Sequence, residues 1–365
     1  MKTKLLIANS ETNADMYYAT RMLIPDEFVY LETEIGRKIY VSDLEFSRAL
    51  QEAKVDEVLN IFSYPKKYKS ALAWIIAENN VKEVVVPDYF PIKYADALRK
   101  MKVKIEIKSG AFFEERAVKQ DDDIAHILAT QKVNEKAMRA AIEVIKKSKI
   151  RKDNKLAYGS KILTSEFLKE FIEMEFVRGG CKSEDDIVSC GMNTSQPHNA
   201  GSGPIFAHQP IIIDIYPKSF KNRYYADMTR TVVKGKASPE IKKIYNTVLR
   251  GQKLAIENVK AGIEIRSLYG KVTDCFEKAG YKTELGSQSP EGFIHNLGHG
   301  VGLEIHERPF LGPKSEDSLQ IGNVITIEPG LYYPGIGGVR IEDMVVVKED
   351  GRDNLTKMPK VLEIK

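Results

Sequence analysis

The chain has little of what marks a secreted or membrane protein. It holds only three cysteines, Cys181, Cys190 and Cys275. An odd and sparse number argues against a disulfide framework and is typical of a reducing compartment, so we expect three free thiols and a cytoplasmic protein. No uninterrupted apolar run reaches the ~18 residues that a membrane span needs. The chain opens with Met1–Ile7 and turns polar at once, which leaves too short an apolar stretch for a signal peptide. We therefore predict neither a membrane span nor secretion.

Two further absences narrow the possible partners. The chain carries 55 Lys and Arg against 51 Asp and Glu, a formal net charge of +4, without a basic block of the kind found in nucleic-acid-binding tails. No glycine-rich phosphate loop follows the strands that we predict in the first part of the chain. We therefore expect no nucleic-acid partner, and no chemistry in this first part.

What is present favours two domains. In the first ~120 residues, predicted strands alternate with predicted helices, which is typical of an α/β layer. The predicted strands are Lys4–Ala8, Glu27–Leu31, Glu57–Phe62, Val81–Pro87 and Val103–Lys108. The predicted helices are Ala14–Met22, Asp43–Glu52 (with Ser42 as its N-cap), Tyr68–Glu78 and Tyr94–Met101.

A long helix marks the predicted domain boundary. Three acidic residues, Asp121–Asp123, complement the positive end of a helix that runs to about Ser148. The length of 365 residues is compatible with two or three domains. We predict a domain over residues 1–120, a scaffold for substrate gating or dimerisation, and a second domain over residues 121–365.

The second part combines helices with strands that contain single acids. We predict helices over Thr164–Arg178, with Ser165 as a possible cap, from Pro239 at the first helical position, and over Ile265–Ala279. Between the first two of these helices, Pro210–Tyr216 and Tyr224–Val233 form a predicted antiparallel hairpin. Such a hairpin can bring Asp214 and Asp227 side by side, because cross-strand neighbours lie close together.

Three later segments concentrate the unusual polar residues. Phe293–Glu307 contains three of the six histidines, His295, His299 and His306, among glycines that favour a strand or loop over a helix. Ile325–Tyr332 and Gly337–Asp343 each embed one glutamate, Glu328 and Glu342, in an apolar run.

Four acids thus interrupt apolar strands, Asp214, Asp227, Glu328 and Glu342. Each alone is compatible with a charge at a strand edge, but carboxylates that are packed together repel and raise one another's pKa. Divalent cations remove this repulsion, and carboxylates with imidazole suit Mn, Co, Zn or Fe. With His299, the set exceeds what a single tetrahedral zinc needs and suits a two-metal site. The implied chemistry is hydrolysis.

These segments resemble those of the M24 metallopeptidases, the family with the creatinase or "pita-bread" fold. Within the family, the sequence is similar to the proline-specific branch of Xaa-Pro dipeptidases (prolidases) and Xaa-Pro aminopeptidases. The resemblance covers essentially the whole chain, strongly from about Asp121 onward and loosely before it. It implies an α+β protein, in which a small α/β domain like the creatinase N-terminal domain precedes a pita-bread catalytic domain with a curved antiparallel sheet.

The resemblance also implies the roles of the metal ligands. Asp214 binds one of two divalent ions (Mn, Co or Zn), and His299 and Glu328 bind the other. Asp227 and Glu342 bridge the two ions. The gap between Asp214 and Asp227 is longer than is usual in the family, which we interpret as a longer hairpin turn that leaves the ligands in place.

Further residues receive roles from the same resemblance. His198 and His306 are similar to histidines that contact the scissile carbonyl and the proline end of the substrate. His295 and Tyr332 match groups near the site, and Arg340 matches an arginine beside it. Glu328 also passes the proton to the leaving proline nitrogen. A homodimer and a proline-containing peptide substrate are implied as well.

Several alternatives stay open at this point. Prolidase-like action on Xaa-Pro dipeptides is our first choice because the chain is compact, and an Xaa-Pro aminopeptidase that cuts longer peptides is the alternative. Creatine hydrolysis and methionine aminopeptidase activity fit the ligand set or the N-terminal domain less well. A protein of this fold that has lost catalysis and acts as a binding module is the alternative from a different class.

Overall fold

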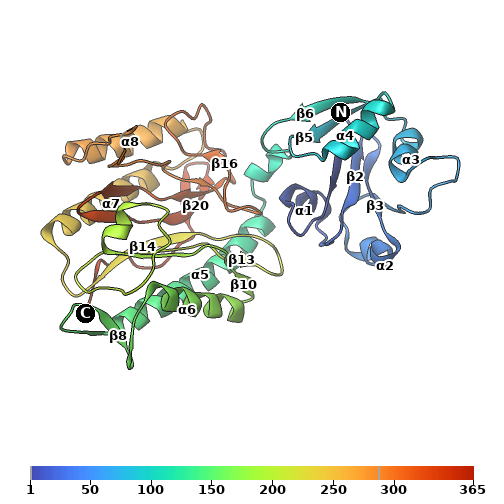
Figure 1. The fold of residues 1–365 in the computed structure, drawn as a ribbon. Coiled ribbons are helices and arrows are strands. Elements are labelled where there is room, and N and C mark those ends of the chain that lie inside the picture. The colour runs from blue at the N-terminus through green and yellow to red at the C-terminus, as the bar shows by residue number, and fades with distance from the viewer. Residues whose placement is uncertain (1, 287) are drawn as a thin grey trace. The chain divides into compact units, whose positions relative to one another are not determined.

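The computed structural model describes residues 2–286 and 288–365. The chain forms two compact units, Met1–Arg116 and Ala117–Lys365 (Figure 1). Across the described residues, no helix combines the length and the apolar character that crossing a membrane requires. The three cysteines are unpaired, as predicted.

The N-terminal unit is built on a six-stranded mixed sheet with the order β4-β3-β2-β1-β5-β6. Strands β1 to β3 run antiparallel to one another, whereas β4, β5 and β6 join the sheet as parallel strands. The strands are β1 (Lys4–Ala8), β2 (Phe28–Thr33), β3 (Gly36–Val41), β4 (Glu57–Asn60), β5 (Glu83–Pro87) and β6 (Lys104–Lys108).

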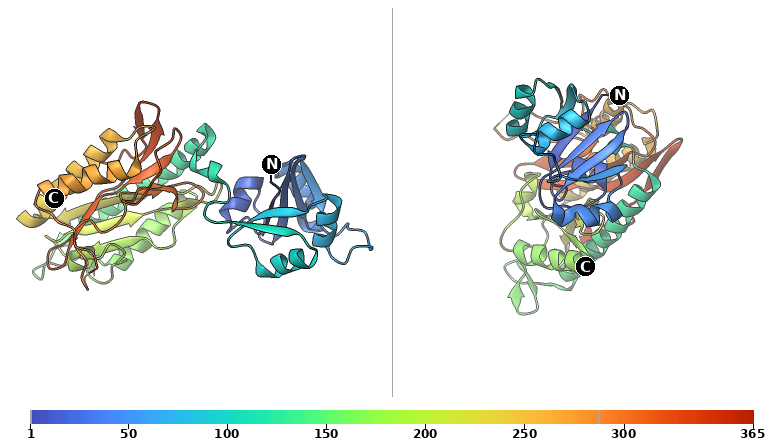
Figure 2. Two further views of the ribbon diagram at one scale, coloured as in Figure 1. Left: turned by 90° about the horizontal axis from the view of Figure 1, so that it is seen from above. Right: turned by 90° about the vertical axis from the view of Figure 1, so that its right-hand side faces the viewer.

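Helices cover both faces of this sheet (Figures 1 and 2). The helices are α1 (Ala14–Thr20), α2 (Asp43–Glu52), α3 (Ala71–Glu78) and α4 (Ile92–Lys100). Leu5 packs with α3 and α4, whereas its neighbour Leu6 packs with α1 and α2. This separation follows from the alternation of side chains along a strand.

Most elements predicted for this unit are confirmed within a few residues, but one strand was missed. Strand β3 begins with Gly36, Arg37 and Lys38, and only its second half is buried. These first three residues lack the apolar side chains from which a strand is predicted, so the sequence pattern of β3 is too short to recognise. Ser42 does precede α2, but its side chain makes no capping hydrogen bond.

In the described part of the C-terminal unit there are four α-helices and most of the strands. The helices are α5 (Asp121–Lys147), α6 (Ser165–Arg178), α7 (Pro239–Asn258) and α8 (Ile265–Lys278). The strands are β7 (Lys149–Ile150), β8 (Leu156–Tyr158), β9 (Lys161–Ile162), β10 (Cys181–Lys182), β11 (Ile187–Cys190), β12 (Ile211–Ile215), β13 (Lys218–Ser219), β14 (Met228–Lys234), β15 (His299–Gly300), β16 (Glu307–Phe310), β17 (Val324–Ile327), β18 (Gly330–Tyr333), β19 (Gly337–Arg340), β20 (Asp343–Lys348), β21 (Gly351–Asn354) and β22 (Glu363–Ile364). The described residues also include two short 3₁₀ helices, η1 (Glu114–Ala117), at the boundary of the two units, and η2 (Gly191–Ser195).

Two sheets of this unit position the site. One has the order β11-β12-β14-β22, the other β16-β15-β17-β20-β21, and their pairings are antiparallel apart from β14 with β22. Helices α5 and α6 pack on the first sheet and α7 and α8 on the second. The backbone N–H of Glu342 donates to the carbonyl of Thr229 (3.1 Å), which ties the two sheets together. The predicted α+β class, with an antiparallel catalytic part, is confirmed.

The helix starts in this unit agree with the sequence except at one cap. Ser238 caps α7 with its side chain, and Pro239 opens the helix as predicted. In α6, however, the cap is Thr164, whose hydroxyl accepts from the N–H of Phe167. Ser165 is the first helical residue, so its prediction as the cap was wrong by one position.

Candidate metal centre

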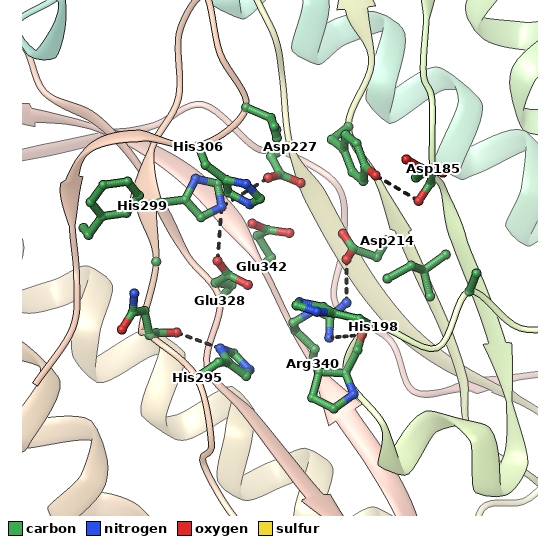
Figure 3. A pocket seen from close by; sticks show the side chains of 18 residues that line it. Asp185, His198, Asp214, Asp227, His295, His299, His306, Glu328, Arg340 and Glu342 are labelled. Carbon is green, nitrogen blue, oxygen red and sulfur yellow. Dashed lines mark hydrogen bonds and ion pairs between the residues drawn. The ribbon is translucent and has the colours of Figure 1, made fainter. Parts of the chain in front are cut away.

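A cavity of about 700 Å³ lies in the C-terminal unit. All five predicted metal ligands line it (Figure 3). They come from segments up to 128 residues apart in sequence, so the fold alone brings them together. These five residues are Asp214, Asp227, His299, Glu328 and Glu342.

The predicted hairpin supplies the two aspartates, with one correction. Strands β12 and β14 pair antiparallel, and Asp214 stands opposite Thr229 rather than opposite Asp227. Asp227 lies two residues before Thr229, just outside β14. Because residues two apart share a face of an extended chain, Asp227 and Thr229 both direct their side chains to the cavity side. The aspartates are thus diagonal neighbours rather than a direct pair.

The second sheet contributes the other three side chains. His299 opens β15, Glu328 follows the last residue of β17, and Glu342 lies between β19 and β20. The N–H of Glu328 donates to the carbonyl of Leu297 (2.9 Å), which holds the glutamate beside the histidine segment. Each side chain therefore sits at a strand end, where the backbone is fixed by the ladder.

Three of these residues form a compact buried group. One ligand atom from each of Asp227, His299 and Glu342 lies within 4.8 Å of the other two. The Nδ1 atom of His299 lies 3.1 Å from the carbonyl of Gly300, which leaves Nε2 to face the carboxylates. A histidine whose second nitrogen is fixed by a carbonyl is a common arrangement in metal sites.

The other two predicted ligands flank this group. Glu328 lies 3.3 Å from Nε2 of His299 (Figure 3). Asp214 accepts a hydrogen bond from the guanidinium of Arg340, and its other oxygen lies 2.8 Å from the hydroxyl of Thr229. Carboxylates with one imidazole are a donor set that suits divalent ions such as Mn, Co and Zn, so these residues fit a metal centre.

Burial and mutual repulsion perturb the charges of the group. Burial, and then the carboxylate of Asp214, raise the pKa of Asp227 well above its ordinary value. Burial, and then the carboxylate of Asp227, do the same to the pKa of Glu342. Burial alone would lower the pKa of His299, but the hydrogen bond and charge of Glu328 outweigh it and raise this pKa to about 9. Several like charges without a cation are thus costly here.

The predicted substrate-contacting residues divide into two sets. His198, His295 and His306 line the same cavity, and the rings of His299 and His306 lie 4.4 Å apart. Tyr332 does not line it. Its hydroxyl accepts from Arg340 (2.8 Å) and lies 3.0 Å from His295, so it connects two lining residues from behind.

The sequence did not single out Thr229, whose hydroxyl lies 2.8 Å from a carboxylate oxygen of Asp214 and 2.8 Å from one of Glu342. The spacing of two residues from Asp227 was the available signal. Asp185 and Tyr216 also line the cavity, and the hydroxyl of Tyr216 donates to the carbonyl of Asp185 (2.9 Å). The sequence around Asp185 gives no sign of this, because it reads as an ordinary acidic loop.

Comparison with known proteins agrees with this geometry. Residues 125–349 match the model of metallopeptidase family M24. The Xaa-Pro dipeptidase of Pyrococcus horikoshii is 32% identical over 354 residues, which cover 96% of this chain and 92% of that protein. The chain therefore belongs to metallopeptidase family M24, and the predicted family is confirmed.

Two solved structures add the fold. The crystal structure of the prolidase from Pyrococcus horikoshii OT3 matches with a TM-score of 0.81 and 28% identity, over 99% of this chain and 95% of that one. The X-Pro aminopeptidase from Thermotoga maritima matches with a TM-score of 0.81 and 23% identity, over 100% and 98%, which shows the shared fold alone. Membership of a metallopeptidase family implies metal ions, and the buried Asp227, His299 and Glu342 provide a group that fits them.

Proposed function

We propose that this protein is a metal-dependent Xaa-Pro dipeptidase that uses two divalent ions. The buried group of Asp227, His299 and Glu342, which shares one cavity with Asp214 and Glu328, carries this proposal. Its support in the comparisons is the similarity to a named Xaa-Pro dipeptidase over 96% of the chain.

The five ligands divide between the two ions as the family resemblance implies. Asp214 would hold one ion, His299 and Glu328 the other, and Asp227 and Glu342 would be shared. When bound, such a pair supplies a Lewis acid for the peptide carbonyl and lowers the pKa of a water molecule. The donor set suits Mn, Co or Zn, and availability decides among them.

Neighbouring side chains then bind the substrate and move the proton. Burial lowers the pKa of His306, so its imidazole is neutral at pH 7 and able to hydrogen-bond a substrate. We assign His198 and His306 to the scissile carbonyl and the proline end. Proline nitrogen has no N–H in the peptide bond and must gain a proton on cleavage, and we assign this transfer to Glu328.

Arg340, Tyr332 and His295 orient these groups. Arg340 fixes Asp214 by an ion pair, and the hydroxyl of Tyr332 lies between Arg340 and His295. Such surrounding hydrogen bonds set the direction of a ligand and hold it in place.

We further infer a cytoplasmic homodimer, in which the N-terminal unit contributes to gating or dimerisation.

The proposal is tested by removing and restoring the metal. The chelated protein should lose hydrolysis of Ala-Pro, and Mn, Co or Zn should restore it, with bound metal measured by elemental analysis. His299→Ala should abolish both metal binding and hydrolysis. His126→Ala is the matched control, since His126 is exposed, stacks on Tyr224 and does not line the cavity, so this variant should retain both.

Two outcomes would redirect the assignment. Activity that survives chelation, with no metal bound, would contradict a metallopeptidase. Metal binding without hydrolysis of any Xaa-Pro peptide would favour the binding-module alternative. The fold is shared with an X-Pro aminopeptidase, so the fold does not distinguish a dipeptidase from an aminopeptidase. The length of the substrate that is cut distinguishes the two.

A further inference from the structure

The loop that carries His306 is closed by a buried carboxylate. Strands β15 and β16 pair antiparallel with Gly300 opposite Glu307, so residues 301–306 form a short loop between them. This loop places Ile305 and His306 in the cavity. The position of His306 beside His299 therefore depends on how the two ends of the loop are held.

Glu307 turns back under this loop. Its side chain is 8% exposed, and its Oε2 accepts from the N–H of Glu304 (3.4 Å). The carboxylate also packs on the backbone of Gly302, where an added Cβ would come within 2.2 Å of Oε1. A buried carboxylate of this kind requires a cation or several hydrogen bonds.

Lys119 supplies the cation. Its side chain is 2% exposed, and its Nζ donates to Oε1 of Glu307. Lys119 lies three residues after the N-terminal unit ends, in the segment that leads into α5. The Lys119–Glu307 pair thus connects the start of the C-terminal unit to the 301–306 loop, which carries His306.

The segment around Lys119 is itself anchored. The N–H of Lys119 donates to the carbonyl of Gly322 (2.9 Å), and the side-chain amide of Asn323 donates to the carbonyl of Ala117 (2.9 Å). Gly322 and Asn323 directly precede β17, which ends beside Glu328. Lys119 is therefore a fixed point relative to the sheet that bears the site.

We propose that Lys119 is a positioning residue, which through Glu307 holds the 301–306 loop so that His306 faces the substrate. Neither Lys119 nor Glu307 lines the cavity, so their effect passes through the loop. This inference rests on the proposed Xaa-Pro dipeptidase function, in which His306 contacts the substrate. A catalytic group that moves by about 1 Å can lose on the order of 100-fold in rate.

The test measures Ala-Pro hydrolysis by the full-length, metal-loaded protein. Lys119→Met should lower kcat/KM by between about tenfold and about 100-fold with full metal content. Lys119→Arg should restore most of the loss, because it keeps the charge. Lys119→Met/Glu307→Gln removes both charges and leaves no buried carboxylate unpaired, so it should fold and still show the lowered kcat/KM.

A matched control separates positioning from general destabilisation. Arg116→Met breaks another buried ion pair, with Asp15, whose side chains are 6% and 7% exposed. This variant should lower the melting temperature but leave kcat/KM near the wild-type value. If Lys119 acts through His306, Lys119→Met should change kcat/KM by less than about threefold in a protein that already carries His306→Ala. The effects of mutations at two interacting residues do not add.

A second readout does not require hydrolysis. The His306 signal in NMR spectra of protein with ¹³C-labelled histidine should shift in Lys119→Met and return in Lys119→Arg. An unshifted His306 signal, or an equal loss of kcat/KM with and without His306, would overturn the role of Lys119. A wild-type protein that cuts no Xaa-Pro peptide would instead contradict the proposed function, and the NMR result would still decide the positioning.

Discussion

The hydroxyl of Thr229 lies 2.8 Å from a carboxylate oxygen of Glu342. Thr229 lies in β14, whereas Glu342 lies between β19 and β20, and the backbone N–H of Glu342 also donates to the carbonyl of Thr229. The same hydroxyl lies 2.8 Å from Asp214 on the neighbouring strand. Thr229 therefore sits between two proposed metal ligands and fixes the directions of both carboxylates.

We predict that Thr229→Val weakens metal binding. Valine keeps the shape of the side chain but removes the hydroxyl, so Asp214 and Glu342 lose a shared partner. Loss of such a partner typically lowers metal affinity or activity by about tenfold to about 100-fold. Titration of the metal-free protein with Mn in competition with a chelating indicator measures the change. Thr229→Ser retains the hydroxyl and should bind metal nearly as wild type does, and an unchanged affinity in the valine variant would contradict this role.

The carboxylate of Glu342 should destabilise the folded protein when no metal is bound. Its carboxylate is 2% exposed, and both burial and the nearby Asp227 raise its pKa. Glu342→Gln should abolish hydrolysis and yet raise the free energy of unfolding of the chelated protein, because glutamine carries no charge for burial and Asp227 to disfavour. Urea unfolding at pH 7 in chelator measures this, with the exposed Glu349→Gln as a control. A lower free energy of unfolding in the Glu342→Gln variant would show that the carboxylates do not repel.

Metal binding should release protons. The pKa values of Asp227 and Glu342 are raised and that of His299 is about 9, so the metal-free group holds protons at pH 7. Metal ions bind the deprotonated forms, and these become more abundant as the pH rises through these values. The affinity should therefore rise from pH 6 to pH 9. Calorimetry in buffers of different ionisation enthalpy counts the released protons, and binding without proton release would contradict the prediction.

A buried arginine behind the site should dominate the stability of this unit. Arg230 is 1% exposed, and its guanidinium donates to Asp343 (2.9 Å) and to the carbonyls of Thr229 (2.8 Å) and Glu342 (2.6 Å). Arg230→Met removes a cationic partner of the buried Asp343 carboxylate. It should lower the free energy of unfolding by about 3–5 kcal/mol.

The control for Arg230 is an exposed pair in the same unit. Lys348 and Asp353 lie 3.5 Å apart with side chains 46% and 65% exposed. Lys348→Met should cost less than about 1 kcal/mol because solvent screens this pair. Urea unfolding of the chelated full-length protein, followed by far-UV circular dichroism, measures both. Equal costs for the two variants would show that burial does not decide the stability here.

The strand ends that carry the ligands could be predicted because their signal is local. Single acids at Asp214, Glu328 and Glu342 stand out against buried apolar neighbours, and burial without a cation is costly. Strand β12, for example, is buried at every position except Asp214. Another local signal made α5 predictable, since three acids stand in its first turn, where they complement the positive end of the helix.

Other features depend on contacts between distant segments, and the sequence could not reveal them. Thr229 is one of several threonines in the chain, and only the register of β12 with β14 places it opposite Asp214. Lys119 pairs with Glu307, which is 188 residues away. The resemblance places Tyr332 near the site, but only the structure shows that it is fully buried and that its hydroxyl accepts from Arg340.

The comparison of a dipeptide with a tripeptide tests the central claim most directly. Metal-loaded protein is incubated with Ala-Pro and with Ala-Pro-Ala at equal concentrations, and kcat/KM is measured for each before and after chelation. The account predicts hydrolysis of Ala-Pro that chelation abolishes and Mn restores, with Ala-Pro-Ala cut far more slowly. Hydrolysis of Ala-Pro-Ala alone would contradict a dipeptidase and favour the aminopeptidase alternative.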